Sequence, residues 1–139
     1  MLEANTNSNR KKNKFHLVLI CDESGIFDAF RIMKEYLGNR GEVFLSLIYA
    51  VPENYHHPLF EREIKILEKR FSHHLYTYTL KVEPGKYDFV QEIIEAIINS
   101  NTHLKMQFLI FGHEEFIEYA TGVLGYLDMD TYSIQSKIN

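Results

Sequence analysis

The residues with the clearest chemical potential form a polar turn, Asp22-Glu23-Ser24-Gly25, between an apolar segment and an amphipathic one. Backbone N–H groups in such a turn can bind phosphate, because glycine permits close approach and the next helix directs its positive end toward the anion. The sequence leaves two roles open for the carboxylates. They could stabilise the start of the helix, or they could oppose an anion by about 3 kcal/mol for each like-charge pair about 6 Å apart, at an effective dielectric of about 20. Ser24 could cap the helix or donate to a phosphate.

Other reactive side chains have ordinary structural explanations. Cys21 ends an apolar segment, where cysteine usually behaves as a small buried hydrophobic residue. The pairs His56-His57 and His73-His74 lack the helical spacing of metal-binding histidines, and adjacent residues of a strand point to opposite faces. The acids of His113-Glu114-Glu115 suit the start of a helix, although they also lie at an edge where ligands bind. The sequence therefore predicts no metal site.

Alternating apolar strands and amphipathic helices must position these residues. Short apolar runs predict buried strands at residues 15–21, 43–49, 74–82, 106–111 and 131–136. Apolar residues at spacings of three and four predict four intervening helices. The alternation is typical of a doubly wound α/β fold, with a mainly parallel five-stranded sheet, helices on both faces and strand order 3-2-1-4-5. In such a sheet, ligands bind beyond the carboxyl ends of the strands, where the strand order reverses.

Composition and charge narrow the class of protein. The 139-residue chain has a formal net charge of −4, which gives no indication of a nucleic-acid partner. Its single cysteine excludes an intrachain disulfide framework and favours a reducing intracellular compartment, the cytoplasm. No apolar run approaches the roughly 20 residues of a membrane span. Residues 1–14 are polar and basic, which predicts a tail or linker, and residues 15–139 are expected to form one domain.

Several motifs, in the expected order, resemble the nucleotide-binding domain of the ferredoxin reductase-like family (the flavin reductase and cytochrome b5 reductase superfamily). Residues 17–28 resemble its first strand and loop, which typically read as an apolar strand and then G-G-T-G-I-x-P. Residues 47–50 are similar to the L-x-Y-G strand, and residues 60–64 match the F-x-x-E-L helix that follows it. Residues 87–91 weakly resemble the start of the third helix. Residues 108–116 resemble the strand that ends in C-G-P-x-x-M.

The resemblance covers roughly residues 15–138 and implies a domain that binds NAD or NADP. It assigns cofactor contacts to Ser24, Gly25, Ile26, Phe89, Gly112, His113 and Glu114. Phe89 would stack on the adenine. In this family, hydride passes between the nicotinamide and a flavin, and the flavin carries the redox chemistry. The resemblance therefore implies FAD on a flavin-binding domain or on a flavoprotein subunit, and an isolated chain without catalytic activity.

The departures from the family pattern leave two functions open. Asp22 and Glu23 replace the leading glycines, and Phe111 replaces the cysteine that contacts the nicotinamide, so we expect weak binding of NAD or NADP. The region around the end of the third strand offers Lys81 and Lys86 but no arginine, which gives no support for a preference for NADP. The first hypothesis is an NAD(P)-binding module of a flavin-dependent oxidoreductase, with the flavin domain in cis or in trans. The alternative is a non-catalytic relative that lost nucleotide binding and acts as a subunit or regulatory interaction module.

Overall fold

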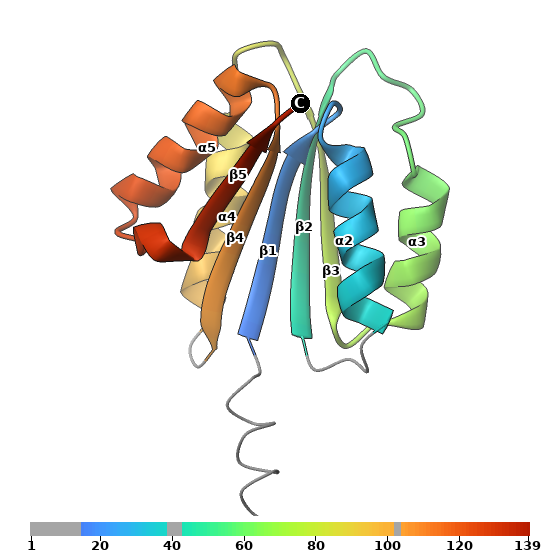
Figure 1. Ribbon diagram of the computed structural model, residues 1–139. Helices are drawn as coiled ribbons and strands as arrows, with labels where there is room; N and C mark the ends of the chain where they lie inside the picture. The colour runs from blue at the N-terminus through green and yellow to red at the C-terminus, as the bar shows by residue number, and fades with distance from the viewer. Residues whose placement is uncertain (1–14, 39–42, 102–103) are drawn as a thin grey trace, which may run out of the picture.

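The computed structural model describes residues 15–38, 43–101 and 104–139, and the tail predicted at residues 1–14 lies outside these ranges. A five-stranded sheet with strand order β3-β2-β1-β4-β5 forms the middle layer (Figure 1). Every neighbouring pair of strands is parallel. The strands are β1 (Phe15–Asp22), β2 (Val43–Pro52), β3 (Leu75–Val82), β4 (Lys105–Gly112) and β5 (Ile134–Ile138). The predicted fold class and strand order are therefore confirmed.

Two helices cover each face of the sheet (Figure 1). The helices are α2 (Ile26–Gly38), α3 (Glu61–Arg70), α4 (Asp88–Ser100) and α5 (Glu114–Tyr126). Helices α2 and α3 pack on one face, and helices α4 and α5 pack on the other. None of the helices within the described ranges has the length and apolar character needed to cross a membrane.

The fifth strand begins later than the predicted range of 131–136. Thr131–Ser133 form a short 3-10 helix, η1, and β5 starts only at Ile134. The cause is local, because the carboxylate of Asp130 accepts a hydrogen bond from the backbone N–H of Tyr132 at 2.9 Å. This bond turns the chain before it can pair with β4.

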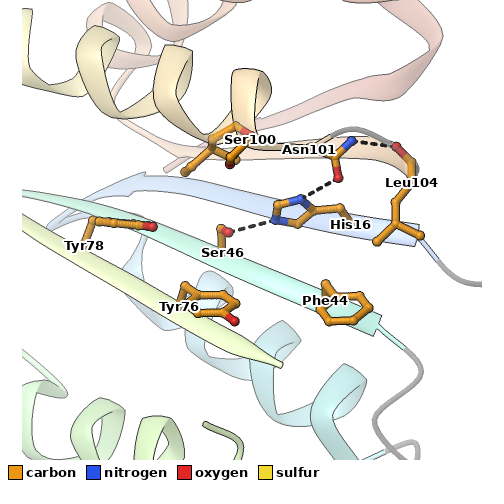
Figure 2. A pocket seen from close by; sticks show the side chains of 9 residues that line it. His16, Phe44, Ser46, Tyr76, Tyr78, Ser100, Asn101 and Leu104 are labelled. Atoms are coloured by element: carbon orange, nitrogen blue, oxygen red, sulfur yellow. Dashed lines mark hydrogen bonds between the residues drawn. The ribbon is translucent and has the colours of Figure 1, made fainter. Parts of the chain in front are cut away.

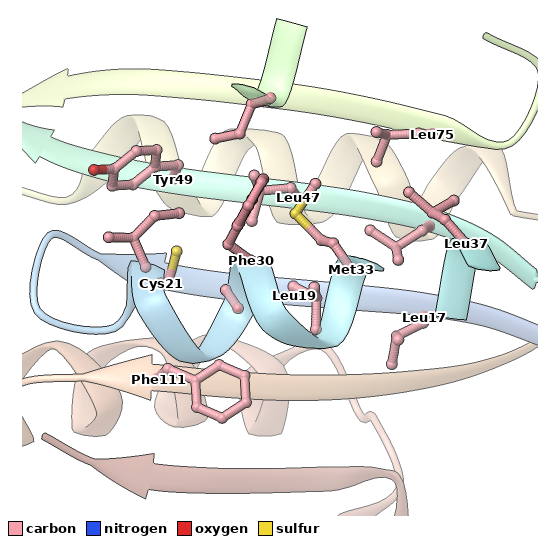
Figure 3. Packing of buried hydrophobic residues seen from close by; sticks show 14 of the residues in the cluster. Leu17, Leu19, Cys21, Phe30, Met33, Leu37, Leu47, Tyr49, Leu75 and Phe111 are labelled. Atoms are coloured by element: carbon pink, nitrogen blue, oxygen red, sulfur yellow. The ribbon is translucent and has the colours of Figure 1, made fainter. Parts of the chain in front are cut away.

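Strand β1 lies at the centre of the sheet and is buried on both faces, which explains its nearly continuous apolar run. Leu17, Leu19 and Cys21 belong to the core layer under α2 and α3 (Figure 3), whereas Val18 and Ile20 face α4 and α5. Burial raises the pKa of the Cys21 thiol well above its usual value, so this side chain is a neutral core residue. Because packing on both faces fixes β1, it also fixes the polar turn that follows the strand.

Candidate functional site

The turn between β1 and α2 lies beside the end of β4, at the edge where the strand order reverses. Helix α2 begins here on one face of the sheet, and helix α5 begins here on the other (Figure 1). The first N–H groups of a helix have no partner within it, and they carry the positive end of the helix dipole. Two helix starts therefore direct hydrogen-bond donors and positive potential at the same edge.

The carboxylate of Asp22 occupies this donor-rich position. Its Oδ1 atom accepts hydrogen bonds from the backbone N–H of Ser24 at 2.9 Å, the Ser24 hydroxyl at 2.8 Å and the backbone N–H of Gly25 at 3.2 Å. Its Oδ2 atom accepts one from the backbone N–H of His113 at 3.0 Å. Asp22 is only 5% exposed. A buried carboxylate is stable only when donors satisfy it, and here four donors do so.

Two glycines make room for this arrangement. A Cβ atom on Gly112 would lie 2.5 Å from Oδ1 of Asp22, so the carboxylate fits only against a residue without a side chain. A Cβ atom on Gly25 would lie 2.3 Å from the backbone oxygen of Phe111, so the turn could not pack against β4. Both glycines match the family pattern, and in this chain both are needed to seat the turn and its aspartate.

A cavity of about 130 Å³ remains at the edge. Among the residues that line it are Asp22, Glu23, Tyr87 and His113. The Nε2 atom of His113 lies 3.5 Å from Oε1 of Glu23, so these two lining side chains are in contact. Pockets for drug-sized ligands usually measure about 300–1,000 Å³. The cavity is therefore too small for a dinucleotide in this conformation.

The structure brings together only some of the predicted contact residues. The hydroxyl of Ser24 neither caps α2 nor faces a free site, since it donates to Asp22. Gly25 packs against the backbone of β4, and Gly112 packs against the carboxylate of Asp22. Ile26 is fully buried in the core, so its side chain is not placed to contact a ligand. His113 lines the cavity. The described cavity does not include Glu114, which lies in the first turn of α5 with an exposed side chain.

The aromatic residue that lines the cavity is not the one that the resemblance placed at the adenine. Phe89 is 61% exposed and does not line the cavity, whereas Tyr87, two residues earlier, does. Burial raises the pKa of the Tyr87 hydroxyl, and the carboxylates of Glu115, Asp22 and Glu23 raise it further. Phe111 does not reach the ligand edge either, because its ring packs in the core layer under α2 (Figure 3). The proline-flanked turn before Tyr87 was the sequence signal that could have singled it out.

Asp22, Glu23 and His113 also raise the question of a metal ion, since each offers a ligand atom within 4.8 Å of the others. The surroundings argue against one. Both oxygens of Asp22 already accept hydrogen bonds. The two helix starts place positive potential at this edge, which opposes a cation and favours an anion. We therefore assign no metal to this cluster.

No protein-family model matches the sequence, and no curated protein matches it either. Solved structures do resemble it. The ferredoxin-NADP+ reductase from Plasmodium falciparum aligns with a TM-score of 0.75 at 16% identity, over 96% of this chain and 55% of that chain. The CS-b5R domains of human Ncb5or, in the NAD+ form, align with a TM-score of 0.74 at 14% identity, over 92% of this chain and 38% of that chain.

The Amycolatopsis cytochrome P450 reductase GcoB aligns with a TM-score of 0.69 at 11% identity, over 89% of this chain and 37% of that chain. The chain thus spans between about two fifths and just over half of the length of these proteins. The similarity in structure agrees with the order of the sequence motifs. The chain has the fold of the nucleotide-binding domain of the ferredoxin reductase-like family.

Proposed function

We propose that this chain is the NAD(P)-type module of a flavin-dependent oxidoreductase, with FAD on a flavin-binding domain in cis or on a partner flavoprotein. The proposal includes a restriction: Asp22 holds the nucleotide edge closed, so the chain binds NAD or NADP weakly and transfers no hydride by itself. The fold supports the class of protein, because the solved structures that resemble it include ferredoxin and cytochrome P450 reductases. The flavin supplies the redox chemistry in such proteins.

The observation that carries the proposal is the convergence of N–H groups on one anion. The backbone N–H groups of Ser24, Gly25 and His113 all donate to the carboxylate of Asp22. Donors from the starts of two helices, one of them 91 residues from Asp22 in the chain, form the kind of site that binds a phosphate. The carboxylate now stands where a ligand anion would accept those bonds. A nucleotide must therefore displace Asp22 before it can use them.

Glu23 also weakens nucleotide binding, although its side chain does not block the site. Its carboxylate lies 3.5 Å from the His113 ring and lines the cavity, where it would face an incoming phosphate. A like-charge pair about 6 Å apart opposes binding by about 3 kcal/mol at an effective dielectric of about 20. Unlike Asp22, Glu23 can swing away from the edge, because its side chain is 26% exposed and makes no hydrogen bond to the turn.

A second function is favoured by the same observation. If the buried aspartate is a permanent part of the fold, the chain is a non-catalytic relative that serves as a subunit or a regulatory interaction module. The four donors on Asp22 favour this reading, since the turn is complete without a ligand. A flavin-binding barrel with an R-x-Y-S/T pattern, encoded in the same or a neighbouring reading frame, would favour the module instead.

Calorimetric titration with NAD and NADP separates the two functions. Asp22→Gly frees the three N–H groups and removes the charge, so we expect about hundredfold tighter binding than for the unmodified protein, as a change of about 3 kcal/mol implies. Asp128→Gly is the matched control, because it removes the same charge at a residue whose φ of 59° suits glycine. A folded Asp22→Gly protein that gains no affinity would exclude the module and leave the non-catalytic function.

A further inference from the structure

A second pocket lies at the amino ends of the strands, opposite the edge that Asp22 closes. It has a volume of about 290 Å³ and is bordered by β1, β2, β3 and the last turn of α4 (Figure 2). Among the residues that line it are His16, Phe44, Ser46, Tyr76, Tyr78 and Asn101. No sequence motif marks this group, because strands and a helix far apart in the chain bring it together.

A directed chain of hydrogen bonds forms one wall of the pocket (Figure 2). The backbone carbonyl of Leu104 can only accept, so the side-chain amide of Asn101 donates to it, at 2.7 Å. The Oδ1 atom of Asn101 then accepts from Nδ1 of His16 at 3.2 Å. In a neutral imidazole this leaves Nε2 as an acceptor, and the hydroxyl of Ser46 donates to it at 2.8 Å. Ser46 lines the pocket although it is only 2% exposed, and its hydroxyl oxygen accepts no hydrogen bond from another side chain among the described residues.

No side chain with a formal charge is found among the described residues that line the pocket. Burial lowers the pKa of His16, which keeps its imidazole neutral, although the hydrogen bond that His16 donates to Asn101 opposes this shift in part. Apart from His16, the described residues that line the pocket have no ionisable group other than two tyrosine hydroxyls. Among the described residues, a ligand therefore meets hydroxyl and carbonyl oxygens and no cationic side chain. Such a surface favours a ligand that donates hydrogen bonds or carries positive charge.

Two further features favour positive charge over a neutral donor. Phe44, Tyr76 and Tyr78 supply three aromatic rings from two neighbouring strands, and the face of an aromatic ring attracts a cation. Ile97, Ser100 and Asn101 place the carboxyl end of α4 at the pocket, where the helix dipole is negative. The last turn of α4 contains no basic residue that would neutralise this end.

We propose that this pocket binds a small organic ammonium ion, with the charged group held between the aromatic rings and the carboxyl end of α4, and with Ser46 as hydrogen-bond acceptor. The site is separate from the nucleotide edge and does not depend on the proposed function. Its volume suits a methylated or primary ammonium group with a short polar tail. The pocket is too small for a nucleotide.

The test compares choline with its neutral isostere 3,3-dimethylbutan-1-ol, which has the same shape without the charge. Each compound is titrated into the full-length protein while two-dimensional NMR follows the backbone amides of Ser46, Tyr76 and Tyr78. Choline should bind about tenfold more tightly than the isostere, the range of a partly desolvated cation–π contact. Equal affinities, or no saturable shift at roughly 100 mM choline, would overturn the proposal.

Substitutions of Tyr76 separate the aromatic ring from its hydroxyl. Tyr76→Phe keeps the ring and should bind choline as the unmodified protein does. Tyr76→Leu removes the ring and should weaken choline about fivefold, while it leaves the isostere unchanged. Tyr132→Leu is the control, since Tyr132 is 91% exposed and does not line the pocket. If Tyr76→Leu weakens both compounds equally, the pocket recognises shape alone and the assignment to cations is wrong.

Discussion

At the carboxyl ends of the strands, a buried carboxylate accepts four hydrogen bonds beside a cavity of about 130 Å³; at the amino ends, a neutral chain of hydrogen bonds borders a pocket of about 290 Å³. The fold leads one to expect the opposite, because ligands of open parallel sheets bind at the carboxyl ends. Topology thus decides where donors converge, and a single side chain decides whether a ligand can reach them.

Helix ends account for the difference in charge between the two regions. Helices α2 and α5 begin at the carboxyl edge and direct N–H groups toward it, which is why Asp22 is stable there. Helix α4 ends at the opposite edge and directs carbonyl groups toward it, which suits a cationic ligand, whereas the lowered pKa of His16 there comes from its burial. The helix ends at the carboxyl edge thus favour a negative charge, and the helix end at the amino edge favours a positive one.

The largest effect should come from Gly25→Ala, which breaks the packing of the closed edge. The new Cβ atom would lie 2.3 Å from a backbone oxygen of β4, and a backbone atom cannot turn away as a side chain can. We expect the free energy of unfolding to fall by about 3 kcal/mol, at the upper end for overpacking. Chemical denaturation measures it. Gly122→Ala is the control, because no atom lies within 4 Å of its Cβ position, and it should stabilise α5 by up to about 1 kcal/mol.

A double-mutant cycle of Gly112→Ala with Asp22→Ala tests whether this glycine serves the aspartate. Gly112→Ala alone should cost about 2 kcal/mol of unfolding free energy, because its Cβ atom would lie 2.5 Å from the carboxylate. In a protein that already carries Asp22→Ala, the same change should cost at least about 1 kcal/mol less. Part of the cost will persist, since Gly112 has a φ of +155°. Additive costs would mean that the glycine and the carboxylate are independent.

His16, in the pocket at the amino ends of the strands, should make the free energy of unfolding depend on pH. The pKa of His16 is lowered in the folded state, so below about pH 6.5 the unfolded chain binds more protons than the folded one. Stability should therefore fall as the pH falls below that value, by no more than about 1.4 kcal/mol per pH unit. His16→Gln should remove this slope, and His57→Gln, at an exposed residue, should keep it. Thermal melts from pH 7.5 to pH 5 measure both, and an unchanged slope in His16→Gln would contradict the account.

The smallest effect is expected from the exposed ion pair near the closed edge. Lys137 of β5 lies 3.4 Å from Asp28 of α2, with side-chain exposures of 60% and 18%. Exposed pairs of this kind contribute about 0–1 kcal/mol. Lys137→Ala should change the free energy of unfolding by less than about 0.5 kcal/mol in denaturant melts. A loss as large as that of Gly112→Ala would mean that exposed charges, as well as the buried one, hold this edge together.

The fold could be predicted from the sequence because the periodicity of apolar residues is a local property of each strand and helix. The apolar run of β1 and the spacing of apolar residues in α2 each predict their element without reference to the rest of the chain. The two sites were less predictable, because they depend on contacts between distant residues. Asp22 meets the N–H of His113 across 91 positions, and His16 meets Asn101 across 85. The sequence identified Asp22 as chemically important and left open whether its carboxylate points inward.

The most direct test of the account follows the backbone amides of Ser24, Gly25 and His113 by NMR during a titration with NAD. In the unmodified protein these amides donate to Asp22 and should not shift at micromolar NAD. In Asp22→Gly they should shift together and saturate, at an affinity about a hundredfold higher. Micromolar binding by the unmodified protein, with shifts at the same three amides, would show that Asp22 does not close the nucleotide edge.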